Sequence, residues 1–477
     1  PFPMSRLSRL LALLALVLPA AAQPASRPNV LFIAIDDLRN DLGAYGVGHA
    51  RTPQLDAFAR TARPFTHHYV QVPTCGASRA ALLRGRYPTE PAHVNNGAIA
   101  QTQARWGDAN LPAWFKRHGY RTYALGKVTH HPGGLAGANW AEPPEELPGA
   151  WDRSWLPASP WPHAEGIMHG YANGRPRVRG QTPALEAHDG PDSAYPDTWV
   201  ADEAARTLRE LAGSKEPWFF AVGFFKPHLP FAAPQRFFAQ HDPAQIPAPA
   251  VTATPVGVSS WHASGEFYQN YGHGERRPDA DEAYARALRH AYAASVSYVD
   301  SEVGRLLEAL AALPGADQTI VVVWSDHGFL LGEHAIWGKH CLYDGALRSP
   351  LLIRAPGLTE PGRASDALVE TVDLFPTLTE LCGLPTPAGL DGRSLTPQLA
   401  RADVPSSKPA VAHWTRGQRT VRTGRWRLIA HEPAGAGAAP AYELFDYAQP
   451  TAESQNLAGA LPAVVNELVR LLPSPVR

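Results

Sequence analysis

Carboxylates that could bind a metal ion follow two apolar segments far apart in the chain. Asp36-Asp37 come directly after the run Asn29–Ile35, and Asp326-His327 come directly after Val321–Ser325. Such runs are typical of buried parallel strands, and open α/β sheets bind ligands at the carboxyl ends of their strands. An isolated Asp-Asp pair is most often a solvated turn. Two acidic pairs at strand ends instead predict a site for a hard cation, Ca²⁺ or Mg²⁺ in preference to Zn²⁺.

Cationic side chains gather in three further places. Lys127 and His130 follow one apolar segment, Lys226 and His228 follow another, and Lys339 comes a short way after the Asp326-His327 pair. Lysine binds sulfate or phosphate oxygens as a point charge, and histidine acts as an acid or base near neutral pH. Any one of these residues is more often a surface charge or a core side chain. Their shared position beyond strands indicates one site for an anion.

Cys75 stands four residues before Arg79, in a chain with only three cysteines. The ordinary interpretation is a buried free thiol, since cysteine is among the most often buried residue types. The odd count leaves at least one thiol unpaired, and no C-x-x-C pair indicates a structural zinc site. The alternative interpretation is that Cys75 takes part in chemistry at the same site.

Taken together and in order, these motifs resemble the type I, formylglycine-dependent sulfatases. The form of the motifs around Lys226 and Asp326 is similar to the iduronate-2-sulfatase branch of that family. The segments that carry the resemblance are Asp36-Asp37, Cys75-x-x-x-Arg79, Gly126-Lys127-x-x-His130, Tyr195-Pro-Asp197, Lys226-Pro-His228-x-Pro-Phe231, Ser325-Asp-His-Gly328, Gly332-Glu-His334, Trp337-x-Lys339, Glu443-Leu-Phe-Asp446 and Glu453-x-x-Asn456-Leu457.

The resemblance implies a nucleophile and a metal site. Cys75 would be oxidised to formylglycine by a formylglycine-generating enzyme, and the hydrated aldehyde would attack the sulfur of a sulfate ester. Ca²⁺ would be bound by Asp36, Asp37, residue 75, Asp326 and His327, the last in place of the Asn of many sulfatases.

The resemblance also implies roles for the cationic residues. Arg79 would orient the nucleophile, and Lys127, Lys339 and His228 would bind the sulfate. His228, assisted by Lys339, would protonate the departing sugar oxygen. His130 would then remove a proton from residue 75 so that sulfate leaves.

The elements that position these residues alternate between strands and helices, which indicates an α/β fold with a mostly parallel central sheet flanked by helices. The family implies an alkaline-phosphatase-like large domain. The strands expected are Asn29–Ile35, Thr122–Leu125, Trp218–Val222, Thr319–Trp324 and Leu351–Arg354. The helices expected are Pro53–Arg63, Asn110–His118, Ala201–Ala212, Glu282–Leu313 and Leu374–Leu381.

The chain divides into three predicted parts. Residues 1–22 carry Arg6 and Arg9, a short apolar run and Ala20-Ala-Ala22, the pattern of a cleavable signal peptide, which predicts a periplasmic or secreted protein. Residues 23–404 form the catalytic domain. Residues 405–477 show short alternating segments, which predict a small C-terminal α+β domain with an antiparallel sheet.

Composition excludes some partners. The formal net charge is −1 and 18 % of residues are charged, so neither nucleic acid nor a membrane is expected as a partner. The substrate expected from the resemblance is a sulfated saccharide, by default a 2-O-sulfated uronate. The loops 140–200 and 240–280 would contact it, with sugar stacking or hydrogen bonding from Trp140, Trp151, Trp155, Trp161 and His163 weighed against ordinary packing of these side chains.

Two other functions agree with the same residues. One is a phosphodiesterase or phosphonate-ester hydrolase of the same superfamily, which would share Cys75 and the metal ligands. The other is a non-catalytic protein that binds sulfated glycans, if Cys75 stays a thiol. Ala77 bears on this choice, because the modifying enzymes usually act on chains with Pro at that position. The oligomeric state is not determined by the sequence.

Overall fold

A computed structural model describes residues 27–131, 145–157, 159–161, 164–258, 264–433, 439–449 and 451–476. The predicted signal peptide lies outside these residues, as do Trp140 and His163. No helix in the described ranges is both long enough and apolar enough to cross a membrane.

An eight-stranded sheet runs through the centre of the molecule in the order β12-β2-β11-β8-β1-β6-β3-β4. All neighbouring strands pair in parallel except β11, which is antiparallel to both β2 and β8. The predicted fold class, an α/β sheet that is mostly parallel, is therefore confirmed. The strands are β1 (Asn29–Ile35), β2 (Arg63–Tyr69), β3 (Arg121–Gly126), β4 (Arg153–Trp155), β6 (Trp218–Phe224), β8 (Thr319–Ser325), β11 (Leu351–Arg354) and β12 (Ser365–Glu370).

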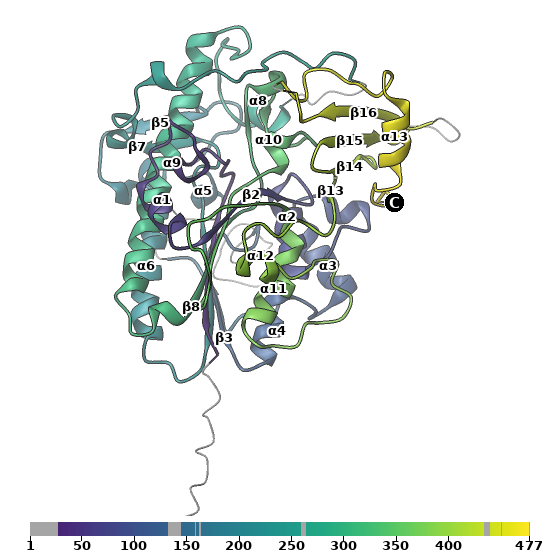
Figure 1. The fold of residues 1–477 in the computed structure, drawn as a ribbon. Helices are drawn as coiled ribbons and strands as arrows, with labels where there is room; N and C mark the ends of the chain where they lie inside the picture. The colour runs from purple at the N-terminus through teal and green to yellow at the C-terminus, as the bar shows by residue number, and fades with distance from the viewer. Residues whose placement is uncertain are drawn as a thin grey trace, which may run out of the picture.

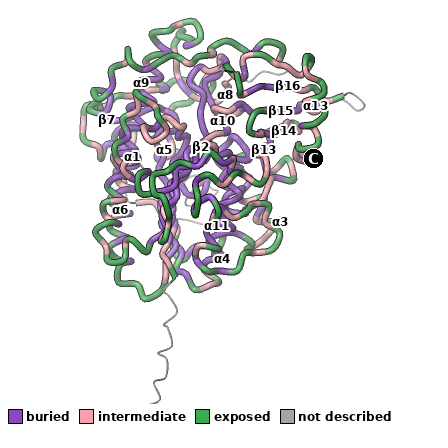
Figure 2. The backbone as a smooth tube through the Cα atoms, viewed as in Figure 1, coloured by how far each residue is buried: buried purple, intermediate pink, exposed green. Residues whose placement is uncertain are grey.

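The central strands are apolar on both faces because helices cover both faces. In β1, Leu31, Ile33 and Ile35 belong to one hydrophobic cluster, whereas Val30, Phe32 and Ala34 belong to another. Successive side chains of a strand point to opposite faces, so the continuous apolar run supplies both cores at once. Figure 2 shows this buried centre inside an exposed periphery.

The helices form one layer on each side of the sheet (Figure 1). One layer consists of α1 (Pro53–Ala59), α6 (Pro196–Leu211) and the long α9 (Glu282–Ala311). The other consists of α2 (Cys75–Arg84), α3 (Ala98–Trp106), α4 (Leu111–Arg117) and α11 (Leu374–Leu381). The shorter elements are α5 (Ala164–His169), α7 (Gln235–Phe238), α8 (Gly265–Asn270), α10 (Asp344–Leu347), α12 (Thr396–Ala400), β5 (Leu185–His188), β7 (Phe231–Pro234), β9 (Leu330–Leu331) and β10 (Trp337–Gly338).

One predicted helix was too long, and the strand that follows it was missed. The segment predicted as a helix over Pro53–Arg63 ends at Ala59, and β2 begins at Arg63. The strand sequence Arg-Pro-Phe-Thr-His-His-Tyr contains polar residues and a proline, so it lacks the apolar signature of its neighbours. It is a strand because β11 and β12 pair with it on either side.

A second sheet lies beside the large one. It is antiparallel, in the order β13-β14-β15-β16, and α13 (Pro462–Val469) packs on it. The antiparallel sheet predicted after residue 405 is thus confirmed, while the exact division at 404 remains a prediction. The His413 N–H donates to the carbonyl of Gln71, so the small sheet is joined directly to the main body. The strands are β13 (Ala410–His413), β14 (Arg419–Arg422), β15 (Trp426–His431) and β16 (Ala441–Asp446).

Candidate active site

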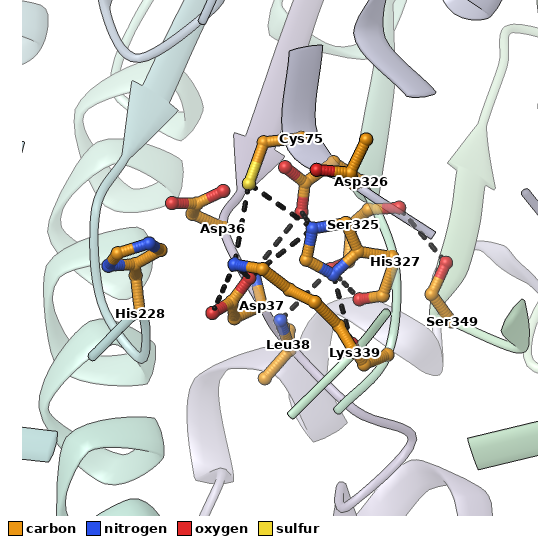
Figure 3. Close-up of polar contacts among 12 residues, drawn as sticks. Asp36, Asp37, Leu38, Cys75, His228, Ser325, Asp326, His327, Lys339 and Ser349 are labelled. Carbon is orange, nitrogen blue, oxygen red and sulfur yellow. Dashed lines mark hydrogen bonds and ion pairs between the residues drawn. The ribbon is translucent and has the colours of Figure 1, made fainter. Parts of the chain in front are cut away.

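Four possible metal ligands meet where β1 and β8 end. One ligand atom from each of Asp36, Asp37, Cys75 and His327 lies within 4.8 Å of the others, and all four residues are buried. The strands are neighbours in the sheet, with Ile35 opposite Ser325, so their following residues are brought to one edge. Cys75, the first residue of α2, also lies at this edge. Figure 3 shows these side chains pointing toward one another.

Asp326 lies beside this group rather than within it. Its Oδ1 accepts the backbone N–H of Asp37 at 3.1 Å, and its Oδ2 is 2.9 Å from Nη2 of Arg79. Asp326 therefore joins β8 to the residue that follows β1. Burial and the nearby Asp36 carboxylate raise the pKa of Asp326.

Asp37 has an unusual backbone conformation, with φ of 60°. Non-glycine residues rarely adopt positive φ, and such strain is held by surrounding contacts. Here the Asp37 N–H donates to Asp326, and the Asp37 carbonyl accepts the Tyr292 hydroxyl at 2.8 Å. The same hydroxyl accepts the N–H of Arg39 at 2.9 Å, so Tyr292 from α9 braces this turn from both sides.

Cys75 is 2 % exposed, and its sulfur faces the cluster. The Sγ lies 3.3 Å from Nε2 of His327 and 3.5 Å from Nζ of Lys339. Burial and then the Asp36 carboxylate raise the pKa of the Cys75 thiol well above its usual value, which disfavours the thiolate. An unmodified Cys75 is thus a weak nucleophile here, since the thiolate is the reactive form.

Asn96 holds the first turn of α2, which carries Cys75. Its Oδ1 accepts the Gly76 N–H at 3.0 Å and the Thr74 hydroxyl at 3.0 Å. A Cβ at position 76 would lie 2.3 Å from the Asn96 carbonyl oxygen, so only glycine allows this approach.

Three buried cations balance the three buried aspartates. Lys127, after β3, pairs with Asp36, and Lys339, after β10, lies 2.9 Å from Oδ1 of Asp37. Burial opposes a charge on each lysine, but these carboxylates outweigh it and raise both pKa values. Burial likewise opposes the charge on Asp36, yet Lys127, His228 and Arg79 hold its pKa well below its usual value.

Arg79 is fully buried behind the acidic residues. Its Nη2 lies 3.1 Å from Asp36 as well as near Asp326, and its Nη1 donates to the carbonyls of Lys127 and Val128. The guanidinium therefore joins the ends of β1, β3 and β8. In this structure it positions the acids and the Lys127 loop.

His327 is presented with a defined ring orientation. Its Nδ1 lies 2.9 Å from the Gly328 carbonyl, which requires a proton on Nδ1 and leaves Nε2 facing Cys75 and Asp37. Ser325 braces the same turn, since its hydroxyl donates to the His327 carbonyl and accepts the Leu38 N–H. Ser349 in turn donates to the Ser325 carbonyl at 2.9 Å.

His228 lies at one side of the cluster, on the loop after β6 (Figure 3). Its Nδ1 is 2.6 Å from the Leu229 carbonyl, so Nε2 is the free end of the ring. Asp197 holds this loop by accepting the backbone N–H groups of Phe225 and Lys226. The Lys226 amine donates to the Pro230 carbonyl at 2.8 Å, so Lys226 stabilises the loop.

His130 lies on the loop that carries Lys127 and is 6 % exposed. Burial and then the Lys127 charge hold the pKa of His130 well below its usual value, so the ring is neutral. Among the described residues no hydrogen bond joins it to the metal-ligand cluster. Glu146 supports the neighbouring backbone by accepting the His131 N–H at 2.6 Å.

A cavity of about 150 Å³ opens beside Lys339. Its walls include Glu266, Lys339, His340 and Trp414. The Trp414 ring stacks on His340 with 5.2 Å between centroids and 10° between planes. Because Trp414 follows β13, the C-terminal sheet supplies part of the wall.

The tryptophans expected to contact sugar have other roles. Trp151 is 7 % exposed and packs near Phe219, and Trp161 is 4 % exposed and donates to the Tyr171 carbonyl. Trp155 stacks on Phe220 and donates to Glu203. These three side chains anchor their segments, which is the ordinary packing that was weighed against sugar contact. Of the residues expected in that role, Trp140 and His163 lie outside the described part of the chain.

The structure thus gathers Asp36, Asp37, Cys75, Asp326 and His327 at one sheet edge, with Lys127, Lys339 and Arg79 among them. Five functional positions had no sequence motif to mark them: Asn96, Glu266, Tyr292, Ser349 and Trp414. Only Tyr292 left a signal, as one of the buried positions repeated along α9.

Comparison with known proteins agrees with this geometry. A family model described as "Sulfatase" matches residues 28–384, and one described as "N-sulphoglucosamine sulphohydrolase, C-terminal" matches residues 332–470. The chain is 33 % identical over 422 residues to iduronate 2-sulfatase of Mus musculus, covering 80 % of this chain and 74 % of that protein. It is 30 % identical over 431 residues to a sulfatase of Formosa agariphila, covering 85 % and 79 %.

Solved structures share the fold. The phosphonate monoester hydrolase of Silicibacter pomeroyi superposes with a TM-score of 0.70 at 25 % identity, covering 93 % of this chain and 94 % of that one.

Proposed function

The chain belongs to the sulfatase family, in its iduronate 2-sulfatase-like branch, and from this membership we propose that it releases sulfate from a saccharide ester with a formylglycine made from Cys75. It is a sulfuric ester hydrolase by family. The observation that carries the mechanism is the convergence of four ligand atoms, including the Cys75 sulfur, within 4.8 Å at the sheet edge.

The donor set fits a divalent cation. Asp36 and Asp37 supply carboxylate oxygens, and the Nε2 of His327 faces them. With a thiolate at position 75 the set would suit Zn²⁺, whereas with an oxygen-bearing residue there it suits Ca²⁺, or less well Mg²⁺. Asp326, which lies beside these four residues next to Arg79, is the further ligand that we propose. When bound, the cation would stabilise charge on sulfate oxygens.

Residue 75, once converted, would supply an oxygen nucleophile where the thiol itself is held neutral by burial. Lys127 and Lys339 flank that position and would bind the non-bridging sulfate oxygens as point charges. Arg79 holds Asp36, Asp326 and the Lys127 loop in register. The positive charges of these three residues would offset the negative charges of the carboxylates and the sulfate.

Two histidines would move protons. His228 presents Nε2 from the side of the site and would protonate the sugar oxygen as it leaves, with Lys339 nearby. His130 is neutral and buried, the state required of a base, and would remove the proton from residue 75 that lets sulfate depart.

The substrate we propose is a sulfated saccharide, with a 2-O-sulfated uronate as the first choice. The support is the similarity to iduronate 2-sulfatase together with the cavity beside Lys339, where Trp414 and His340 offer a flat aromatic wall. Aromatic faces of this kind give large contact areas to a ring that carries polar groups at its edge.

Mass spectrometry of the peptide that contains Cys75, from protein expressed with a formylglycine-generating enzyme, tests the modification. The expected peptide is lighter by the difference between CH₂–SH and CHO. The same preparation is then assayed on a disaccharide with a 2-O-sulfated uronate, one with 6-O-sulfated glucosamine, an aryl sulfate and an aryl phosphonate. Conversion of the 2-O-sulfated uronate fastest supports the proposal, and a thiol peptide with no turnover contradicts it.

The same assay distinguishes the second candidate function. The likeness to a phosphonate monoester hydrolase makes the aryl phosphonate the informative comparison. Faster hydrolysis of the phosphonate than of every sulfate would assign the chain to that activity. Saccharide binding without turnover, with Cys75 intact, would assign it to a non-catalytic binding protein.

We also propose that the protein is exported, to the periplasm or beyond. The support is the signal-peptide pattern over residues 1–22. Amino-terminal sequencing of the mature protein should then begin at Gln23, and recovery of the intact leader would contradict export by cleavage.

A further inference from the structure

Glu266 is a carboxylate at the active site that none of the sequence motifs contains. It belongs to α8, next to the cavity beside Lys339, and its side chain is 18 % exposed. Its Oε1 lies 3.6 Å from Nε2 of His228, and its Oε2 lies 3.4 Å from Nζ of Lys339. One carboxylate thus lies between the two side chains proposed to act on the leaving oxygen.

Glu266 is held in the ionised form. Burial opposes its charge, but Lys339, His228 and His340 outweigh burial and keep the pKa of Glu266 well below its usual value. An ionised carboxylate only accepts hydrogen bonds. The Lys339 amine, whose pKa the nearby carboxylates raise, is the donor that matches it.

The distance to His228 is informative in itself. At 3.6 Å the contact between Nε2 of His228 and Oε1 of Glu266 is longer than an ordinary hydrogen bond. The opposite nitrogen, Nδ1, is committed to the Leu229 carbonyl at 2.6 Å. Nε2 thus faces Glu266 without a hydrogen bond to it and is accessible to another partner.

Lys339 is shared in a similar way. Its amine lies 2.9 Å from Asp37, 3.4 Å from Glu266 and 3.5 Å from Sγ of Cys75. Asp37 draws this amine toward the metal-ligand cluster, and Glu266 draws it toward the cavity. Replacing Glu266 would remove the carboxylate on the cavity side and leave the amine paired with Asp37.

We infer that Glu266 is a positioning residue for departure of the leaving group, holding the Nε2 of His228 and the amine of Lys339 on the cavity side of the sulfur. This inference rests on the sulfatase reaction proposed above. In that reaction the bond between sulfur and the sugar oxygen breaks, and its electron pair stays with the oxygen. That oxygen takes a proton from Nε2 of His228. The sulfuryl group passes to the hydroxyl oxygen of residue 75, whose own proton goes to solvent, and solvent later returns a proton to His228.

The consequence is a dependence on the leaving group. A sugar alkoxide is strongly basic and must be protonated as it leaves, whereas a nitrophenolate is stable without a proton. General acid catalysis contributes about 10²- to 10⁴-fold to a rate. The Glu266→Gln variant should therefore lower kcat for the sulfated disaccharide about 100-fold more than kcat for 4-nitrophenyl sulfate.

The experiment measures kcat and KM of the full-length, formylglycine-bearing protein on both substrates. Three variants are compared: Glu266→Gln, His228→Ala, and the two combined. The control is Glu308→Gln, which removes an exposed carboxylate of α9, outside the loops 140–200 and 240–280, and should leave both rates unchanged. Mass spectrometry of the residue 75 peptide in each variant separates a catalytic effect from a failure of maturation.

The expected result is a raised ratio of aryl to sugar kcat in Glu266→Gln, the same direction in His228→Ala, and no further change of the ratio in the double variant. Glu266→Asp, with its carboxylate retained, should recover part of the sugar activity. An equal loss on both substrates, or a change in KM alone, would overturn the positioning role. If the wild-type protein hydrolyses neither sulfate ester, the proposed function itself is refuted. This outcome is seen with the wild type alone, before any variant is compared.

Discussion

Replacing Tyr292 with Phe should weaken metal binding as well as the fold. The Tyr292 hydroxyl makes two hydrogen bonds, one to the Asp37 carbonyl at 2.8 Å and one from the Arg39 N–H at 2.9 Å. The residue is 1 % exposed, so phenylalanine would leave both backbone groups buried and unpaired. Each such group costs about 1–3 kcal/mol, which predicts a loss of about 2–6 kcal/mol in the free energy of unfolding.

The second effect arises because Asp37 has a positive φ of 60° and carries a proposed metal ligand. Loss of the brace allows the turn to relax toward an ordinary conformation, which moves the carboxylate. Residues that orient metal ligands typically change affinity about 10- to 100-fold when they are replaced. We therefore expect the Ca²⁺ concentration that restores half the activity of chelator-treated enzyme to rise by about that factor.

Tyr45 provides a matched control. Its hydroxyl also makes two backbone hydrogen bonds, to the Leu351 carbonyl and from the Leu351 N–H, both at 3.1 Å. Tyr45→Phe should lower the thermal midpoint in a similar way but leave the Ca²⁺ requirement as in the wild type. If both variants show the same Ca²⁺ requirement, Tyr292 does not hold the metal-binding turn and the reasoning is refuted.

Three further outcomes follow from the same geometry. Chelation should abolish sulfate release and lower the thermal midpoint, because a ligand at 100 times its dissociation constant stabilises a fold by about 2.7 kcal/mol; activity that survives exhaustive chelation contradicts a metal at Asp36 and Asp37. Trp414→Ala should raise KM for a sulfated disaccharide about 3- to 10-fold, the equivalent of one aromatic contact, with little change for an aryl sulfate, and equal KM changes on both would place Trp414 outside the saccharide contact. Burial raises the pKa of Glu146 from 4.5 to about 7, although the hydrogen bond from the His131 N–H opposes this shift. Protonated Glu146 therefore contributes up to about 3 kcal/mol to the free energy of unfolding below pH 4.5, and this contribution is lost as the pH rises through 7. Glu146→Gln should thus show a smaller fall in thermal midpoint between pH 5 and 8 than the wild type, and identical slopes would show that Glu146 does not titrate in this range.

Much of the central architecture was predictable because it depends on local signals. The run Asn29–Ile35 is apolar throughout, which indicates a strand covered on both faces, and β1 occupies those residues. The repeat of apolar positions along Glu282–Leu313 predicted a single helix, and α9 spans Glu282–Ala311. By contrast, β2 contains Pro64 and two histidines and owes its strand conformation to β11 and β12.

The residues that could do chemistry were recognisable in the sequence from their types and their order. The contacts between them were not predictable from the sequence. Motif spacing alone named Asp37 and Asp326, yet the hydrogen bond between them spans 289 positions and depends on β1 lying beside β8. Glu266 and Trp414 had no motif, since their place at the site follows from the packing of α8 and the C-terminal sheet near Lys339. Periodicity and motifs thus predicted the apolar strands and the long amphipathic helix and marked the residues that carry charge, because those properties belong to a short stretch of chain. Only the tertiary structure decided which distant side chains meet, because long-range pairing depends on how whole layers pack.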